Sequence, residues 1–67
     1  MISGTVSEGS KVRLTNGLIA WIVEVFDQSN FLAEILNAKG TIDETRDISI
    51  SDIKSVFVEY EEPINAQ

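Results

Sequence analysis

Residues 11–25 read KVRLTNGLIAWIVEV and contain the clearest indication of the fold of this chain. Its first part alternates, with Val12 and Leu14 on one face and charged side chains between them, as in a strand that is buried on one side. Asn16 and Gly17 follow, and both residue types tolerate the positive φ angles of tight hairpin turns. A longer apolar segment comes next. The stretch therefore predicts a β-hairpin.

The second arm of this hairpin, residues 18–26, is apolar on both faces. Ala20 and Ile22 fall on one side. The apolar residues on the other side are Ile19, Trp21, Val23 and Val25. Either the strand is buried on both faces, or it bends through a β-bulge and changes the sheet that it serves. Because the strands of a small barrel must curve to close, we expect the bulge.

Three further strands are expected after this hairpin, at residues 31–36, 41–50 and 56–60. A helix over residues 31–39 is the alternative to the first of them, but the hairpin context favours the strand. Residues 51–55 form a short polar break with a single isoleucine, Ile53, which suits one 3-10 turn whose isoleucine plugs the core. Pro63 stops the last strand, since proline cannot donate a hydrogen bond to a neighbouring strand.

Five short strands, with a 3-10 turn before the last, predict an all-β fold, a small SH3-like barrel over residues 10–60. Residues 1–9 are expected to be a flexible lead-in and residues 61–67 a C-terminal tail. A chain of 67 residues allows one domain. It has neither Cys nor His, so disulfides and the usual metal sites cannot stabilise it. Dense packing of β-branched residues, or association with another chain, must do so instead.

A glycine-punctuated pattern, G-x-K-V-R-L-x-x-G-x-x-A-x-I-V-E-V, runs over residues 9–25. It is followed by F-x-A-E at residues 31–34 and by D-I at residues 52–53. These motifs resemble KOW and Tudor-type domains, and small bacterial families of unknown function that share this start. Ala20 stands where KOW motifs usually carry glycine. The resemblance implies an SH3-like barrel, and KOW domains often associate with the ribosome or RNA polymerase.

The charge balance is acidic, with five Lys and Arg against eleven Asp and Glu and a formal net charge of -6. Such a charge repels the phosphate backbone and so disfavours a nucleic-acid partner. It suits a soluble protein or a partner with a basic surface. No signal peptide is visible, and the longest apolar run, residues 18–23, is far too short to span a bilayer. We expect a cytoplasmic protein without membrane association.

Residues suited to catalysis are few. Without His and Cys the chain lacks the commonest general base and the best nucleophile. Two sets of carboxylates remain, Glu24 with Glu34 and, in one loop, Asp43, Glu44 and Asp47. Solvated strand faces and a polar loop explain them better than an acid–base pair or a cation site. The scattered glycines form no phosphate-binding loop. We therefore expect no enzyme activity, no cofactor and no metal site.

Aromatic and basic residues mark the candidate binding surface. Lys11 and Arg13 share one strand face, and Trp21 is expected across from them on the hairpin. Phe57 is expected beside Trp21, and Tyr60 is the third aromatic candidate. Exposed apolar patches of this kind mark contact surfaces.

The outward position of Phe57 follows from strand alternation. Val56 and Val58 are expected to face the core, which turns Phe57 and Glu59 outward. An outward Phe57 near Trp21 would complete an apolar surface flanked by basic side chains.

The sequence thus predicts a non-enzymatic binding module whose partner is another protein or a second copy of itself, bound around Trp21 and Phe57. One alternative is a nucleic-acid or ribosome-associated KOW-like module that uses Lys11, Arg13 and Trp21. Another is an acidic inhibitor or immunity protein, encoded by a phage or a gene cassette, that acts against a basic target.

Overall fold

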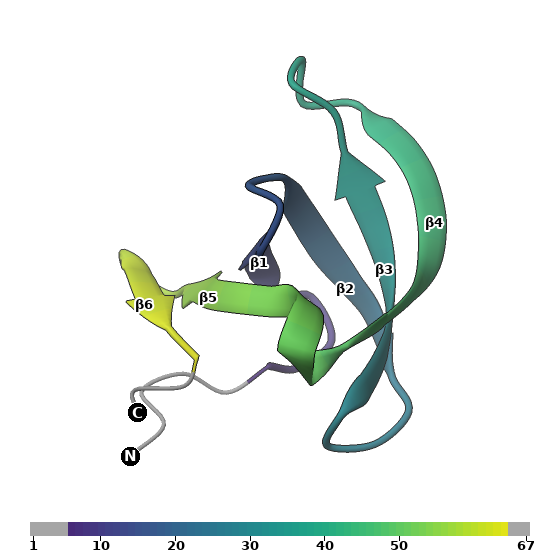
Figure 1. The fold of residues 1–67 in the computed structure, drawn as a ribbon, viewed down its shortest axis with the longest axis vertical. Helices are drawn as coiled ribbons and strands as arrows, with labels where there is room; N and C mark the ends of the chain where they lie inside the picture. Colours follow the sequence, from purple (N-terminus) through teal and green to yellow (C-terminus); the bar gives the residue numbers. More distant parts are fainter. Residues whose placement is uncertain (1–5, 65–67) are drawn as a thin grey trace.

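The computed structural model describes residues 6–64, and its strands form one antiparallel sheet in the order β4-β3-β2-β1-β5-β6 (Figure 1). The strands are β1 (Lys11–Leu14), β2 (Ile19–Val25), β3 (Asn30–Leu36), β4 (Ile42–Ser49), β5 (Ile53–Phe57) and β6 (Glu61–Pro63). One short 3-10 helix, η1 (Ile50–Asp52), joins β4 to β5. The all-β prediction is confirmed, and residues 31–36 form a strand and not the alternative helix.

The prediction of a closed, five-stranded barrel is wrong in two respects. The sheet has six strands, and it stays open between its edge strands β4 and β6. The sixth strand comes from residues 61–63 of the predicted tail, where Pro63 had marked the end of the fold. Because β6 is an edge strand, a proline there need not donate to a further neighbour. The sheet therefore continues past the point where the sequence suggests that it stops.

The sheet is curled (Figure 1), and one apolar core lies on its inner face. Every strand except the edge strand β6 places at least one buried side chain in it, and Ile64 adds one directly after β6. The buried apolar residues are Val12, Leu14, Ala20, Ile22, Phe31, Ala33, Ile35, Ile48, Ile53, Val56 and Ile64. The opposite face of the sheet, here called the outer face, is the one that carries the candidate site.

A bulge in β2 decides which of its side chains reach the outer face. The register of β2 against β3 shifts between Ile22 and Glu24, which leaves Val23 as the extra, exposed residue. The shift reverses the alternation, so Val25 turns inward and packs against the core. The predicted bulge is confirmed, and because it precedes Val25, that residue does not share the face of Ile19, Trp21 and Val23 on which strict alternation placed it.

The β1–β2 hairpin closes with a three-residue loop. The Leu14 N–H donates to the Leu18 carbonyl (2.8 Å), and the Gly17 N–H donates to the Leu14 carbonyl (2.9 Å). Gly17 has a φ of 92°, whereas no non-glycine residue in 6–64 has a positive φ. Asn16 therefore contributes its side chain, which accepts a hydrogen bond from the Leu18 N–H (3.0 Å), and not a left-handed backbone. The β3–β4 loop repeats the pattern with Gly40 at a φ of 86°.

β5 begins and ends before the predicted strand at residues 56–60. Ile53 is buried directly after η1, as expected of the isoleucine that plugs the core. β5 ends at Phe57 because the chain turns, with the Val58 N–H donating to the Tyr60 carbonyl (3.0 Å). Val58 is therefore 66% exposed, and its predicted place in the core is wrong.

The N-terminal segment meets the sheet before β1 begins. Val6 packs against the core, and the Gly9 N–H donates to the Ile22 carbonyl (2.8 Å). Residues 6–9 of the predicted lead-in thus contact the sheet. The remainder of that lead-in, residues 1–5, and the end of the predicted tail, residues 65–67, lie outside the described residues.

Candidate functional site

The candidate site lies on the outer face, where three adjacent strands bring predicted residues into one row. Lys11 of β1 is opposite Trp21 of β2 on one side and opposite Phe57 of β5 on the other. Residues that are opposite each other in neighbouring strands point to the same face. The row therefore runs Trp21–Lys11–Phe57 across the middle of the sheet.

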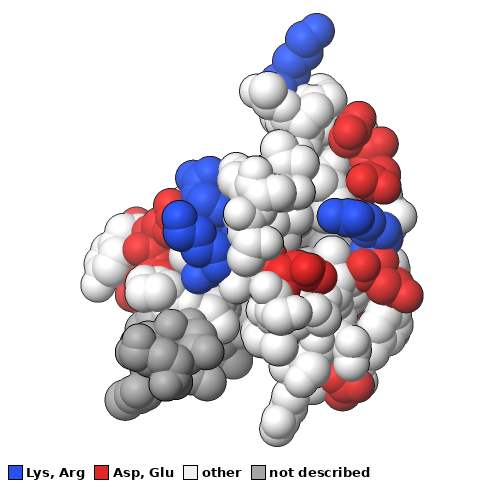
Figure 2. All heavy atoms as spheres, in the orientation of Figure 1, with Lys and Arg blue, Asp and Glu red and all other residues white. Residues whose placement is uncertain are grey.

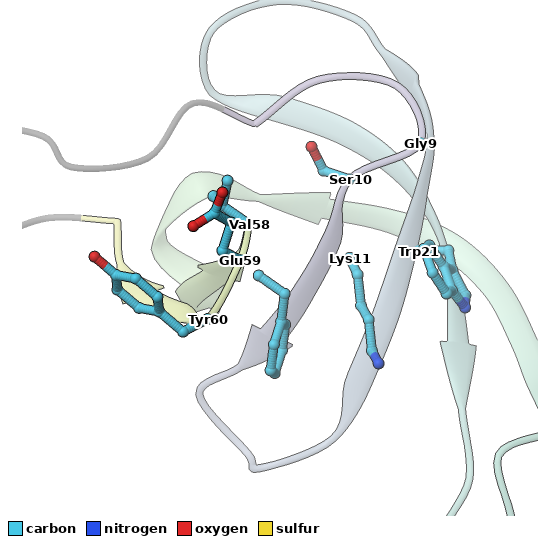
Figure 3. A pocket seen from close by; sticks show the side chains of 8 residues that line it. Gly9, Ser10, Lys11, Trp21, Val58, Glu59 and Tyr60 are labelled. Carbon is cyan, nitrogen blue, oxygen red and sulfur yellow. The ribbon is translucent and has the colours of Figure 1, made fainter.

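Both rings of this row contact the lysine between them, and Figure 3 labels Lys11 and Trp21. The Lys11 Nζ atom lies 5.8 Å from the centroid of the Trp21 ring and 5.1 Å from the centroid of the Phe57 ring. Arg13, two residues along β1, places its guanidinium carbon 5.5 Å from the same Phe57 ring. These distances are typical of cation–π contacts. Two basic side chains thus cover part of Phe57, while Trp21 stays 40% exposed.

A shallow open pocket of about 410 Å³ adjoins this row, between the start of β1 and the turn that follows β5 (Figure 3). Its lining residues are Gly9, Ser10, Lys11, Trp21, Phe57, Val58, Glu59 and Tyr60. Tyr60 is 68% exposed, and Figure 3 shows its ring on the side of the pocket away from Trp21. The pocket is mixed in character, because a lysine and a glutamate line it together with aromatic and aliphatic groups.

Arg13 is also tied to the edge strand β6. Its Nε–H donates to Glu61 Oε2 (2.9 Å), its Nη1 donates to the Gly17 carbonyl (3.0 Å), and the Ser55 hydroxyl donates to the same Glu61 oxygen. The Ser55 hydrogen bond and then the Arg13 guanidinium lower the pKa of Glu61 below its ordinary value. Arg13 therefore has an ion-pair partner within the fold.

The outer face beside this row is apolar along β2. Ile19, Trp21 and Val23 point outward from this inner strand, and Val23 is 43% exposed. Leu32 and Leu36 of β3 continue the surface next to them. Antiparallel sheets that face water on one side normally place polar residues there. This face departs from that pattern.

Carboxylates border the apolar area on the side of β3 and β4. Glu34 of β3 is opposite Trp21. On β4, Asp47 is opposite Leu32 and so shares the outer face, whereas Glu44 is opposite the core residue Ile35. Figure 2 shows acidic side chains on the edge of the molecule where Figure 1 places this strand. The acidic surface thus lies across β2 from the cations of β1.

Four of the five predicted site residues come together, namely Trp21, Phe57, Lys11 and Arg13, and Tyr60 lies at the pocket. Sequence reasoning missed Glu34 and Glu61 as neighbours of this site. Alternation along β3 marks Glu34 as outward, but only the register shows that it is opposite Trp21. Glu61 gave no such signal, because β6 itself was not predicted.

The carboxylates that were candidates for chemistry do not converge. Glu24 is opposite Leu32, and Glu34 is opposite Trp21, so the two glutamates are not paired across β2 and β3. Glu44 makes a long ion pair with Arg46 on its own strand (3.9 Å). Within residues 6–64, no group of three or more His, Cys, Asp or Glu side chains is placed to hold a metal ion.

No family model, curated protein or solved structure matches the chain. None of the helical segments found in residues 6–64 has the length and apolar character needed to cross a membrane.

Proposed function

We propose that this chain is a non-enzymatic binding module that contacts another protein, or a second copy of itself, through the outer face around Trp21 and Phe57. The observation that carries the proposal is the exposed apolar surface of an inner strand, β2, next to a lysine held between two aromatic rings. Surfaces with an exposed apolar centre and a polar rim are typical of contact sites between proteins.

The chemistry of the surface suits a protein partner. Tryptophan and arginine are enriched at the energetically dominant positions of protein interfaces, where an apolar body and a polar tip are both used. Lys11 contacts both rings and Arg13 contacts Phe57, yet Trp21 and Val23 stay 40% and 43% exposed. A partner that covered the exposed parts of Trp21 and Val23 would bury apolar area beside a charge that is already held in place.

A nucleic-acid partner has less support. Arg13 is already paired with Glu61, and Glu34 lies on the other side of Trp21 from Lys11. A phosphate or a stacked base at Trp21 would therefore meet a carboxylate as well as a cation. The net charge of -6 adds a general repulsion.

The proposal is tested with a double variant, Trp21→Ala with Phe57→Glu, which removes the apolar centre of the surface. Capture of proteins from a lysate by the immobilised chain, and sedimentation velocity of the chain alone, are measured for the wild type and the variant. We expect the double variant to lose capture, self-association or both while its far-UV circular dichroism stays that of a folded β protein.

Phe26→Ala is the matched control, since Phe26 is an aromatic residue that is 51% exposed and does not line the pocket. This variant is expected to behave as the wild type. The proposal is wrong if the double variant keeps every association of the wild type. RNA binding that falls steeply with salt and depends on Lys11 and Arg13 would favour the nucleic-acid alternative instead.

A further inference from the structure

The outer face carries opposite charges at equal distances on the two sides of Trp21. Lys11 is opposite Trp21 on the β1 side, and Glu34 is opposite it on the β3 side. Neighbouring strands lie about 4.8 Å apart, so a cation and a carboxylate flank the indole one strand away on either side. Neither Lys11 nor Glu34 has an ion-pair partner among residues 6–64.

An apolar stripe separates these two charges. It consists of the outward residues of β2, Ile19, Trp21 and Val23, and so runs along the strand, at right angles to the row of charges. The stripe ends at Val23, because the bulge turns Val25 toward the core. The β2 stripe, as these three residues are called here, is the centre of a charge pattern that is positive on one side and negative on the other.

This pattern is complementary to itself. When a second copy is placed face to face by a two-fold axis that runs along the β2 stripe, the two sides of the pattern exchange. Lys11 of each copy then faces Glu34 of the other, and Trp21 faces its own counterpart. A two-fold axis at right angles to the strands would instead place Lys11 against Lys11 and Glu34 against Glu34. The charges therefore select one orientation of an isologous contact.

We propose that two copies of this chain associate through their outer faces about a two-fold axis along the β2 stripe, with reciprocal Lys11–Glu34 ion pairs. The inference rests on the proposed function, because it uses the same surface and names its partner. Charge complementarity across an interface fixes orientation and excludes mismatched arrangements. Covering the β2 stripe supplies the apolar burial that such a contact needs.

The contact is small. The described part of the chain measures 32 × 24 × 19 Å, so even a whole face of each copy gives no more than a standard-size interface, about 1,600 Å² in total. Two copies also repel each other through their net charge of -6, and salt at physiological strength screens that repulsion beyond about 8 Å. We therefore expect a dimer whose population depends on concentration.

The test reverses the charge at each position. In Lys11→Glu, two glutamates of each copy meet two glutamates of the other, and in Glu34→Lys, lysines meet lysines. For each variant alone, we expect the dissociation constant of the dimer, measured by sedimentation equilibrium, to be at least about tenfold higher than that of the wild type. An equimolar mixture of the two variants should associate again, because every contact then joins a glutamate to a lysine.

Renewed dimer formation in the mixture is the decisive result. If either substitution only damaged the structure of its own chain, adding the other variant could not restore association. The double variant with both reversals should also form its own dimer. Lys39→Glu and Glu8→Lys are matched controls, because they change the net charge by the same amounts at exposed positions away from the β2 stripe. Both should associate as the wild type does.

The inference is wrong if the wild type stays monomeric up to about 1 mM, or if it dimerises and the mixed variants do not. A monomeric wild type that still captures a different protein through Trp21 and Phe57 would overturn the second-copy inference alone. If the Trp21→Ala, Phe57→Glu variant keeps both capture and self-association, the proposed function and the second-copy inference are both wrong.

Discussion

Lys11 has a double role that only its neighbours reveal. Its ammonium group contacts the rings of Trp21 and Phe57 at 5.8 and 5.1 Å. Exposed cation–π contacts contribute about 0.5 to 1 kcal/mol each. The same group presents a positive charge on a face that the carboxylate of Glu34 borders on the other side. A neutral residue of similar length at this position would keep the apolar packing and lose the charge pattern.

Gly17 is the residue on which the β1–β2 loop depends. Its φ is 92°, a conformation that L-residues with a side chain rarely adopt, and no atom lies within 4 Å of an added Cβ. The cost of Gly17→Ala is therefore conformational and not steric, and we expect the free energy of unfolding to fall by about 1 kcal/mol. Urea denaturation of the purified variant measures it.

A D-alanine at position 17, introduced by chemical synthesis, is the control for this prediction. D-residues favour positive φ, so this variant should be at least as stable as the wild type. Equal destabilisation by L- and D-alanine would contradict a conformational origin and point to a steric one.

Some residues of the site could be predicted from the sequence, and others could not. Trp21, Lys11 and Arg13 could be predicted because the hairpin that carries them is local and its alternation is regular. Phe57 could be predicted to face outward, although Val58 next to it was misplaced because the turn after β5 ends the alternation. Glu34 could not be assigned as a neighbour of Trp21, because the register of β2 against β3 depends on the bulge.

Among the elements, β2 shows how one extra residue changes the face to which the following side chains point. A regular strand of alternating residues would place Trp21, Val23 and Val25 on one face. The bulge at Val23 keeps the first two outside and turns Val25 into the core. The sequence alone predicts that a bulge is present, because the segment is apolar on both faces, but it does not fix the residue at which the register shifts.

β6 is held to the sheet by a carboxylate that responds to pH. Glu61 accepts hydrogen bonds from Ser55 and Arg13, and its pKa is lowered from an ordinary value of 4.5. A lowered pKa in the folded state stabilises the fold above the ordinary value, and this contribution is lost as the pH falls through the folded-state pKa. We expect stability to decline below about pH 4.5, and to decline less steeply in Glu61→Gln.

Glu62→Gln is the control for this element, because Glu62 is on the same strand and its loss changes the net charge equally. Thermal unfolding followed by circular dichroism between pH 3 and 7 gives the comparison (a range of about four pH units that brackets the ordinary pKa). If Glu61→Gln and Glu62→Gln have the same pH dependence, the contact of Glu61 with β1 and β5 does not stabilise β6.

For the whole molecule, the end of the described chain belongs to the core. Ile64 is 4% exposed, and its N–H donates to the Lys54 carbonyl (3.3 Å). Replacing a buried isoleucine by alanine costs about 2 to 4 kcal/mol. Small domains are stable by only about 5 kcal/mol or somewhat more. We therefore expect Ile64→Ala to lose a large part of the stability, measured as a lower urea midpoint.

Two further variants make this prediction specific. Ile64→Val removes one methylene group and should cost about 0.5 to 1.5 kcal/mol. Val58→Ala truncates a side chain that is 66% exposed, and it should change stability by no more than about 0.5 kcal/mol. A similar midpoint for Ile64→Ala and Val58→Ala would show that the residues after β6 do not contribute to the core.

Because of its position in the sheet, β1 cannot complete its strand pairing until late in the synthesis of the chain. β1 lies between β2, its neighbour in sequence, and β5, which is made much later. The consecutive strands β1 to β4 can pair as they are made, but one edge of β1 stays unpaired until β5 is available. Pairing of such distant segments is the slow step in β proteins. During that interval the alternating charges of Lys11 and Arg13 discourage the exposed edge from pairing with other nascent chains.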